Sequence, residues 1–568
     1  MGLPERLIAS LRFRTTDSCV PMSADGHISD PIASLAATAP ERVLLCASVS
    51  AEASDDVFAD ASGEDIGAAP ATLSWTSKVL DRWIQRIEHK LLSAGLAPGA
   101  PVAVFAPRRP ATVALLWAIW RTGGIAVPLN TRQPAGSAVN QAERAGARLL
   151  VSSDAEVAKK AMEAGTPAAR FDAFTEPPSG ASAGADDASA GSSIRASAGG
   201  GAAFPEEGSL RASLLPLDAR ATAVFTSGST GTPKLAVHTL GNHVYSARGS
   251  AENIPVSAAS RWLASLPFYH VGGLAIVFRC ALAGATLAVP SQGMGLLSAI
   301  RVLRPTHVSM VATQLKRLLS TPSVRDDLQS IEAILLGGSA IPPALLDDAY
   351  ARGWPVHISY GSTEMASQVT ATPPNPSRET LATSGRCLPY RVISIQAGGD
   401  GKGGDEKGEE ESVGEIYVGG KPLFAGYATS NAADGPLDAA RTAEGLFATG
   451  DLGSIDDAGR LHVTGRADRL IVSGGENIQP EEVEAALERC EGILFAAVVG
   501  VPDAEFGERP VAFVEWEGEE RNLDAELRNK LPGYKLPDAI HPMPREAIHA
   551  SLKVDYKILE STARKLPN

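Results

Sequence analysis

The chain has 568 residues, which is enough for more than one domain and for a large hydrophobic core. Its formal net charge of -14 would repel a polyanion, which argues against nucleic acid as a partner. The 5 cysteines are scattered without CxxC spacing, so the sequence favours neither a disulfide framework nor a zinc site, and it suits a reducing compartment.

Two segments bear on targeting and on membranes. Residues 1–30 are expected to form an extension, and their arginines among small and hydroxyl residues resemble an organelle transit peptide. An ordinary frayed terminus is the alternative. The most apolar run starts at Val271 and carries Arg279 and several glycines, which would be costly in lipid. We therefore expect buried core there and no transmembrane segment.

The rest of the chain predicts an α/β architecture. Short apolar strands such as "PVAVFAP", "HVSMVAT" and "AILLGG" alternate with helical stretches such as "TVALLWAIWRTGG". The segment "QPEEVEAALERC" predicts a structural helix that starts at Pro480. Residues 176–209 and 398–412 are nearly all small or polar and cannot bury enough apolar surface, so we expect disordered surface insertions there.

The stretch "TSGSTGTPK" joins two predicted strands and has the composition of a phosphate-binding loop. It is not a Walker P-loop, because Pro233 precedes Lys234 and Leu235 follows it. Its backbone N–H groups and hydroxyls could still wrap phosphates, with the lysine adding a point charge. A solvated turn is the alternative. The expected ATP-binding residues of this loop are Thr226, Ser227, Gly228, Ser229, Thr230, Gly231 and Lys234.

Further motifs extend the predicted nucleotide site. In "YGSTEMASQ", Tyr360 could stack on a purine, while Thr363 and Glu364 could hold Mg²⁺. Asp451 could accept hydrogen bonds from both ribose hydroxyls, with support from Arg466. Singly, each of these is more often a surface turn residue. Small residues of "LLGGSAIPP" would let a flat ring lie against the backbone, or form a plain strand-end turn. The remaining expected residues are Gly338, Ser339 and Gly361 for ATP, and Thr230 beside Glu364 for the metal.

Together, and in this order, these stretches resemble the adenylate-forming superfamily of acyl-CoA synthetases, luciferases and nonribosomal adenylation domains. The resemblance runs from about Pro31 to Leu559 apart from the two insertions. It implies that a carboxylate attacks ATP to give an acyl-adenylate and pyrophosphate, and that a thiol then displaces AMP. It also implies a large multi-sheet AMP-binding domain at 31–467 and a small mobile α+β domain at 468–568.

The resemblance also assigns roles in the C-terminal part. Asp468 falls at the family's hinge position, and "HASLKVDYKIL" places the catalytic lysine at Lys553. Gly474 and Gly475 are implied for CoA binding. Leu235 and Leu552 stand where the family usually has glycine.

Several stretches, among them "TLGNHVYSARGS", "LPFYHVGGL" and "SGGENIQPEEVEAAL", look most like the branch of the family that acts on 2-succinylbenzoate in phylloquinone or menaquinone biosynthesis. That substrate has two carboxylates, of which the aromatic one must stay ionised and needs donors. His270 is the preferred candidate and is also expected to act in catalysis with Lys553 and Glu364; a structural histidine is the alternative. The expected substrate-binding residues are Asn242, His243, Arg248, His270, Gly337, Gly338, Ser367 and Gln368.

The sequence thus predicts an acid–thiol ligase that uses ATP, Mg²⁺ and CoA, with small molecules as its partners and its oligomeric state open. Catalysis is expected to rest on positioning and electrostatics, because the attacking carboxylate needs no base at neutral pH. An aryl or fatty acid–CoA ligase is the rival reading within the family, and a luciferase-like oxygenase also fits the nucleotide motifs. A nucleotide-binding regulatory protein without turnover is the alternative from another class. We expect a plastid (chloroplast) location, with cytoplasm or peroxisome as alternatives.

Overall fold

The computed structural model describes most of the chain. The described residues are 23, 25–48, 72–175, 182–183, 214–226, 233–321, 327–338, 341–396, 413–430, 432–473, 476–503, 506–517, 521–547 and 554–566. Several predictions lie outside them: the loop residues Ser227, Gly228, Ser229, Thr230 and Gly231, and also Ser339, Gly474, Gly475, Leu552 and Lys553. Most of 1–30, 176–209 and 398–412 lies outside as well.

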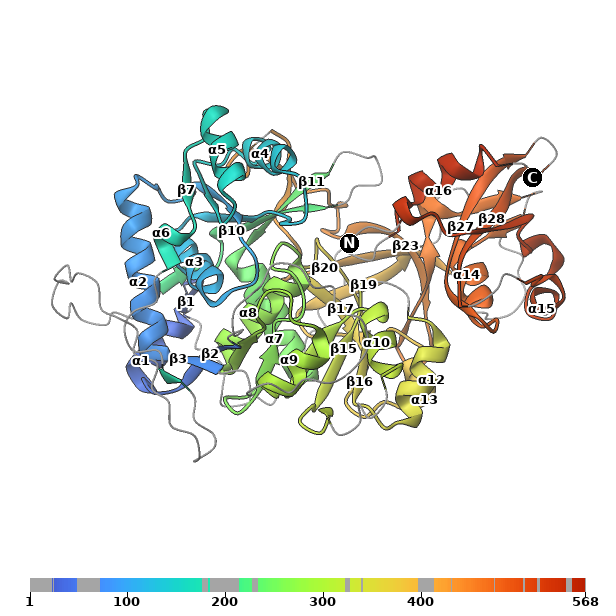
Figure 1. Ribbon diagram of the computed structural model, residues 1–568, viewed down its shortest axis with the longest axis horizontal. Helices are drawn as coiled ribbons and strands as arrows, with labels where there is room; N and C mark the ends of the chain where they lie inside the picture. The colour runs from blue at the N-terminus through green and yellow to red at the C-terminus, as the bar shows by residue number, and fades with distance from the viewer. Residues whose placement is uncertain are drawn as a thin grey trace.

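The first large sheet has eight strands, of which five adjacent ones run parallel (Figure 1). Helices connect four of these five in chain order, as parallel neighbours require. In spatial order they are β22 (Leu437–Asp438), β21 (Gly426–Ala428), β11 (Lys234–Thr239), β10 (Arg220–Thr226), β5 (Ile125–Pro128), β4 (Pro101–Phe105), β6 (Leu149–Ser152) and β7 (Ala168–Arg170). Its helices are α2 (Ser77–Ser93), α3 (Pro110–Arg121), α4 (Ala135–Arg144), α5 (Ala155–Glu163) and α6 (Asp172–Thr175).

The second large sheet has ten strands, and six adjacent ones at its centre run parallel. In spatial order they are β18 (Arg386–Cys387), β17 (Ser367–Ala371), β16 (Val356–Ser362), β15 (Ala333–Leu336), β14 (His307–Met310), β12 (Arg261–Leu263), β13 (Thr286–Val289), β2 (Val43–Ser48), β3 (Thr72–Thr76) and β8 (Ser182–Ala183). Its helices are α1 (Pro31–Thr38), α7 (Leu240–Asn253), α8 (Val271–Ala283), α9 (Leu296–Leu303), α10 (Ala312–Leu319), α12 (Pro343–Ala351) and α13 (Arg378–Leu381). A two-stranded sheet pairs β1 (His27–Ser29) with β9 (Leu214–Pro216).

Two smaller sheets complete the fold. The four-stranded sheet contains β19 (Arg391–Gln396), β20 (Gly414–Gly420), β23 (Phe447–Ile455) and β24 (Leu461–Arg466). The five-stranded C-terminal sheet contains β26 (Glu476–Ile478), β25 (Ile471–Ser473), β28 (Gly507–Trp516), β27 (Ile493–Asp503) and β29 (Ala539–Pro542), with helices α14 (Pro480–Glu488), α15 (Asp524–Arg528) and α16 (Tyr556–Ala563) and two short 3₁₀ turns, η3 (Gly533–Lys535) and η4 (Arg545–Ala547). It forms a separate small lobe at the right of Figure 1. The short helix η2 (Ala467–Arg469) connects the lobes and contains the predicted hinge residue.

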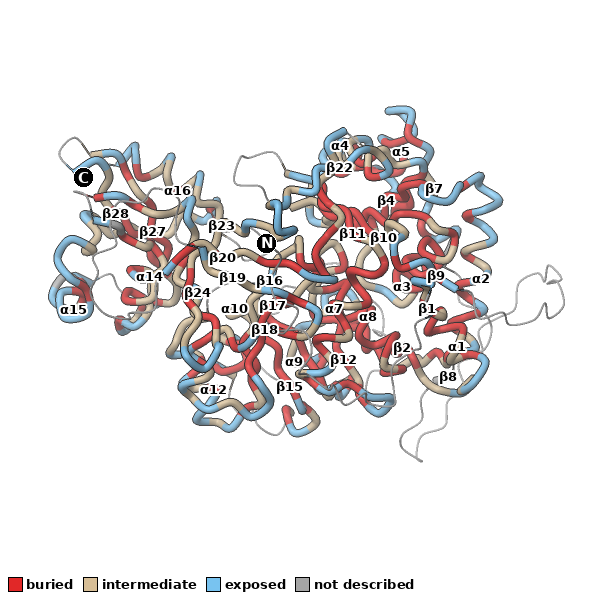
Figure 2. The backbone as a smooth tube through the Cα atoms, turned by 180° about the vertical axis from the view of Figure 1, so that it is seen from behind, coloured by how far each residue is buried: buried red, intermediate tan, exposed pale blue. Residues whose placement is uncertain are grey.

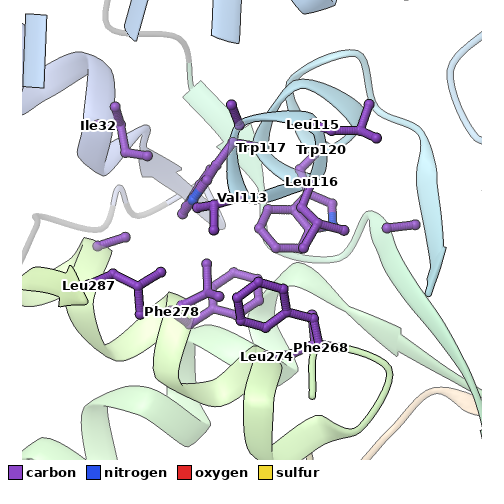
Figure 3. Close-up of a cluster of buried hydrophobic side chains, with 14 of the residues drawn as sticks. Ile32, Val113, Leu115, Leu116, Trp117, Trp120, Phe268, Leu274, Phe278 and Leu287 are labelled. Atoms are coloured by element: carbon purple, nitrogen blue, oxygen red, sulfur yellow. The ribbon is translucent and has the colours of Figure 1, made fainter. Parts of the chain in front are cut away.

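The main core lies where helices of the two large sheets meet. Trp120 on α3 stacks on Phe278 of α8 with ring centroids 4.6 Å apart, and Trp117 lies 5.8 Å from the same ring (Figure 3). Figure 2 shows the buried residues running through both sheets, with a separate buried interior in the small lobe. The apolar run from Val271 is therefore core, as predicted. No helix in the described ranges is long and apolar enough to cross a membrane.

A buried ion triad ties the first helices to this core. Arg121 on α3 donates to Asp30 and to Asp81, each at 2.6 Å, and the three side chains are 4%, 0% and 1% exposed. Asp30 also caps α1, because it accepts from the backbone N–H groups of Ile32 and Ala33. The burial raises the pKa of Asp81 even beside the guanidinium. The two buried carboxylates therefore depend on Arg121 as their counter-ion.

Candidate active site

The ends of the predicted phosphate loop lie side by side. Strands β10 and β11 pair antiparallel with Thr226 opposite Lys234, and the hydroxyl of Thr226 donates to the lysine carbonyl at 3.4 Å. Lys234 is exposed at this edge, with its Nζ 5.0 Å from the ring centroid of Tyr427. Leu235, the first of the two leucines in place of family glycines, is buried in the sheet.

Tyr427 connects that lysine to the predicted metal ligand. Its hydroxyl donates to Oε1 of Glu364 at 2.5 Å, and burial together with this carboxylate raises the pKa of the tyrosine. The described residues contain no group of three His, Cys, Asp or Glu side chains that could hold a metal alone. One carboxylate suits Mg²⁺ that is held mainly by phosphates and water. The donor set therefore fits a metal that arrives with the nucleotide. Thr363, the other predicted ligand, accepts from Nε2 of His238 at 2.7 Å through its backbone carbonyl.

The predicted ribose site is assembled from three elements. The hydroxyl of Tyr360 on β16 donates to Oδ2 of Asp451 on β23 at 2.6 Å, and Arg466 on β24 donates to Oδ1 of Asp451 at 3.1 Å. Burial raises the pKa of Asp451, while these two donors lower it. Burial and Asp451 raise the pKa of Tyr360, so the phenol stays protonated. Arg466 also binds the hinge residue Asp468 at 2.8 and 3.1 Å.

The turn between β16 and β17 is strained. Ala366 has φ 53° and Ser367 has φ 140°, which are left-handed values that cost non-glycine residues energy. The turn is packed closely: a Cβ at Gly361 would lie 2.1 Å from the carbonyl oxygen of Ser367. Gly361 therefore permits a conformation that presents the side chains of Ser367 and Gln368 inward.

Those side chains meet an arginine that sequence reasoning did not assign to the site. Arg279 on α8 donates through Nη2 to Oε1 of Gln368 at 2.7 Å and to Oγ of Ser367 at 3.3 Å. It lies over the ring of Trp262 at 5.1 Å and is 2% exposed. Burial lowers its pKa to about 10. The signal was present in the sequence, as the single charge in the most apolar run.

Arg279 has no acidic counter-ion in the described part of the chain. The neighbouring thiol of Cys280 carries no compensating charge at neutral pH, because burial raises its pKa to about 12. The Nε of Arg279 and the Nε2 of Gln368 are buried donors without partners among the described residues. A buried charge is costly unless it is paired. The arrangement therefore suits an anionic ligand.

Other predicted acyl-site residues are held by partners of their own. Asn242 donates to the carbonyls of Lys421 and Leu423 at 2.9 and 2.8 Å. His243 contacts the hydroxyl of Thr222 at 2.7 Å and stacks on Phe278, and complete burial lowers its pKa well below the usual value. Asn242 could not reach a substrate without giving up these contacts, whereas Nδ1 of His243 is buried without a hydrogen-bond partner among the described residues.

The remaining predicted residues lie nearer the surface. Arg248 is half-buried on α7, and His270 is half-buried at the N-terminal end of α8, with its ring 4.7 Å from Tyr269. Gly337 follows β15, and a Cβ there would lie 2.9 Å from Oγ of Ser359, whereas Gly338 has φ 88° and open space around it. A side chain at Gly337 would therefore crowd Ser359, and the left-handed φ of Gly338 favours glycine.

A cavity of about 520 Å³ lies beyond Tyr269. The carboxyl ends of β4 and β6 from one sheet and of β12 and β13 from the other contribute to its wall. Arg108, Arg109 and Arg132 line it together with a single carboxylate, Asp154, which already caps α5. Burial and the charge of Arg132 lower the pKa of Arg108. The cavity therefore has an excess of positive charge.

Comparisons with known proteins agree with this geometry. The family model described as "AMP-binding enzyme" matches residues 64–428, and the one described as "AMP-binding enzyme C-terminal domain" matches residues 482–552. A 2-succinylbenzoate–CoA ligase of Bacillus licheniformis is 36% identical over 342 residues, covering 60% of this chain and 69% of that protein. Its counterpart from Bacillus velezensis is 33% identical over 459 residues, covering 80% and 86%.

Solved structures match over nearly the whole chain. The o-succinylbenzoate CoA synthetase of Bacillus subtilis in complex with its acyl-adenylate intermediate gives a TM-score of 0.75 at 27% identity, covering 95% of this chain and 99% of that one. The same enzyme in complex with ATP and magnesium ion gives 0.73 at 28% identity, covering 93% and 98%. The chain therefore belongs to the AMP-binding enzyme family, the adenylate-forming superfamily, and within it is similar to the 2-succinylbenzoate–CoA ligases.

Proposed function

We propose that the chain is an AMP-forming acid–thiol ligase that joins 2-succinylbenzoate to CoA. In the first step the succinyl carboxylate attacks the α-phosphate of ATP and pyrophosphate leaves; in the second the CoA thiol displaces AMP. The named activity of the relatives supports this, as do the bound acyl-adenylate and ATP of the solved structures. The observation in the chain itself that carries the proposal is the buried Arg279.

The reasoning concerns the second carboxylate of the substrate. It takes no part in the reaction, remains ionised, and must be buried with the aromatic ring. Arg279 is a buried positive charge without an acidic partner in the described ranges, and Ser367 and Gln368 hold it in place. Pairing the two ions compensates both desolvation costs, and truncating one partner of such a pair is strongly unfavourable. A fatty acid offers no charge to this arginine.

The residues assigned to ATP are supported by their contacts with one another. Asp451 is positioned by Tyr360 and Arg466 to accept from the ribose hydroxyls. Lys234 is assigned to the β- and γ-phosphates and Glu364 to their metal, and the contacts of both side chains with Tyr427 support this. Mg²⁺, when bound, supplies charge neutralisation to those phosphates. Lys553 is proposed to stabilise the charge that develops on the α-phosphate.

The cavity beyond Tyr269 suits the phosphate-bearing end of CoA. Its arginines supply the charge that phosphates need, and Tyr269, which lines the cavity, contacts the ring of His270. We place the thiol end of CoA near His270.

The test measures pyrophosphate release with four acids, each with and without CoA. The acids are 2-succinylbenzoate, 3-benzoylpropionate (the same succinyl arm without the aromatic carboxylate), benzoate and octanoate. We expect 2-succinylbenzoate to exceed the others by about 10-fold or more, the value of one charge-assisted hydrogen bond. Equal turnover with octanoate or 3-benzoylpropionate would contradict the substrate assignment.

We further propose that the product enters phylloquinone or menaquinone biosynthesis. A plastid is the proposed compartment, on the composition of residues 1–30. A fluorescent fusion of those residues that stays in the cytosol or enters peroxisomes would contradict the location.

A further inference from the structure

A second buried arginine lies behind the turn that holds Arg279. Arg391, the first residue of β19, is 8% exposed, and its guanidinium contacts three segments of the chain. Nε donates to the carbonyl of Gln368 at 2.6 Å, Nη1 to the carbonyl of Pro389 at 2.7 Å, and Nη2 to the carbonyl of Ser246 at 3.0 Å. The side chain thus joins β17 to α7.

These contacts brace the strained turn at both of its ends. Arg391 holds Gln368 directly, and it also holds Ser246, whose hydroxyl donates to the carbonyl of Ala366 at 3.2 Å. Residues with left-handed φ persist only where the surrounding structure fixes them. The braced segment carries Ser367 and Gln368, the two side chains that accept from Arg279.

Gly249 on α7 makes room for this arginine. A Cβ at that position would lie 2.3 Å from Nη1 of Arg391 and 2.5 Å from the carbonyl oxygen of Pro389. The backbone atom cannot yield easily, so any side chain on Gly249 would displace the guanidinium. The sequence of α7 and the position of Arg391 are therefore coupled.

The two arginines also concentrate positive charge around Gln368. The pKa of Arg391 is lowered to about 9, mainly by burial and in part by the charge of Arg279. The acidic side chain that favours its ionised form is Glu252, which is exposed, and no carboxylate in the described ranges forms an ion pair with either guanidinium. A ligand with an additional negative charge would compensate both.

We propose that Arg391 is a positioning and specificity-determining residue for the aromatic carboxylate of the substrate. It keeps Ser367 and Gln368 in the geometry that orients Arg279, and its charge favours doubly charged over singly charged acids. This inference rests on the proposed function, because the substrate must carry a second carboxylate.

The experiment compares adenylation of 2-succinylbenzoate and 3-benzoylpropionate, followed as pyrophosphate release without CoA, in the wild type and in three variants. Arg391→Met removes both the hydrogen bonds of the guanidinium and its positive charge. Arg391→Lys keeps the charge but loses the planar guanidinium, and Gly249→Ala displaces the guanidinium. Gly136→Ala on α4, where the space is open, is the matched control.

Arg391→Met should raise KM for 2-succinylbenzoate by about 10-fold or more and leave KM for ATP within about 3-fold. KM for 3-benzoylpropionate should change much less, so the preference for the dicarboxylate falls. Arg391→Lys should retain part of the preference, Gly249→Ala should lose most of it, and Gly136→Ala should lose none.

Different results overturn different claims. If Arg391→Met and Gly249→Ala impair both acids equally, Arg391 has a structural role alone and the inference is wrong. If Arg391→Met and Gly249→Ala both keep the wild-type preference for 2-succinylbenzoate, the inference is also wrong. If Arg391→Met is insoluble, the inference is judged by whether Gly249→Ala and Arg391→Lys lose preference for 2-succinylbenzoate over 3-benzoylpropionate. A wild-type enzyme that does not distinguish the two acids contradicts the proposed function before any variant is compared, and the inference then falls with it.

Discussion

Arg466 donates two hydrogen bonds to the carboxylate of Asp468, at 2.8 and 3.1 Å. The same guanidinium donates to Asp451, the predicted ribose ligand. The hinge residue is thereby tied to the nucleotide site through one side chain. The Arg466 and Asp468 side chains are 42% and 41% exposed, so solvent screens the pair and rotation at the hinge can break it.

Replacing Asp468 with proline should separate the two half-reactions. Asp468 lies in a 3₁₀ turn, whose φ proline can adopt, but proline prevents the change of φ that a domain rotation needs. Thioester formation from supplied acyl-adenylate should slow by about 10-fold or more, while adenylation is largely kept. Asp468→Ala, which loses the ion pair without fixing φ, is the control. Equal loss of both steps in Asp468→Pro would refute rotation at this residue.

Lys553→Ala should show the opposite bias. Losing a charge that acts on the reacting phosphate should lower the adenylation rate by about 10²–10³-fold and leave thioester formation almost unchanged. Pyrophosphate release and conversion of supplied acyl-adenylate measure the two steps. Lys557, exposed on α16, is the matched control. If Lys557→Ala loses adenylation and Lys553→Ala does not, the lysine was assigned wrongly.

Tyr427→Phe should weaken the use of Mg²⁺. The hydroxyl orients Glu364, and losing a partner that orients a metal ligand typically costs about 10-fold in metal affinity. We expect a higher Mg²⁺ concentration at half-maximal adenylation, with KM for the acid unchanged. Tyr417→Phe removes a hydroxyl that contacts Glu415, away from the predicted metal ligand, and should have no effect. The proposed role of Tyr427 fails if both variants respond alike.

Arg109→Met combined with Arg132→Met should act on the second half-reaction alone. Both residues line the cavity assigned to the phosphates of CoA. KM for CoA should rise by about 10-fold, and the rise should be smaller for dephospho-CoA, which lacks one phosphate. Arg148→Met removes an exposed arginine elsewhere and serves as the control. An unchanged KM for CoA would place its phosphates at another site.

Arg121→Met should destabilise the fold by about 3–5 kcal/mol, because it leaves Asp30 and Asp81 buried without their partner. Burial already raises the pKa of Asp81, and losing Arg121 would raise it more. A carboxyl group whose pKa is higher in the folded than in the unfolded state stabilises the folded protein at pH values below the unfolded pKa. That contribution is lost as the pH rises through the folded pKa. The deficit, measured by urea unfolding, should therefore be larger at pH 8 than at pH 5. Arg301→Met, which breaks a surface pair, should cost less than about 1 kcal/mol.

Local pattern predicted the individual elements well. The stretches "PVAVFAP", "HVSMVAT" and "AILLGG" contain β4, β14 and β15, "TVALLWAIWRTGG" lies within and just after α3, and the helix at Pro480 is confirmed. These elements are short, apolar and strongly periodic. Ser182–Ala183 was expected to belong to a disordered insertion, but it forms β8 against β3, because backbone hydrogen bonds at a sheet edge need no particular side chain.

The site was less accessible to sequence reasoning. Tyr360, Asp451 and Arg466 were assigned to the nucleotide one by one, and the structure adds that they contact each other across three strands. Arg279 was noticed as an unusual charge in an apolar run, but its meaning depends on Gln368, which is far away in the chain. The pairing of distant segments decides that meaning, and a single sequence does not contain it.

The antiparallel pairing of Thr226 with Lys234 has a consequence for engineering. Because the two residues that enclose the glycine-rich loop are paired with each other, the strands set their own register. A loop of another length or sequence could be exchanged between them as a cassette without sliding β10 against β11. Affinity for the phosphates could then be varied by grafting this loop while the acyl site, built on other strands, keeps its substrate.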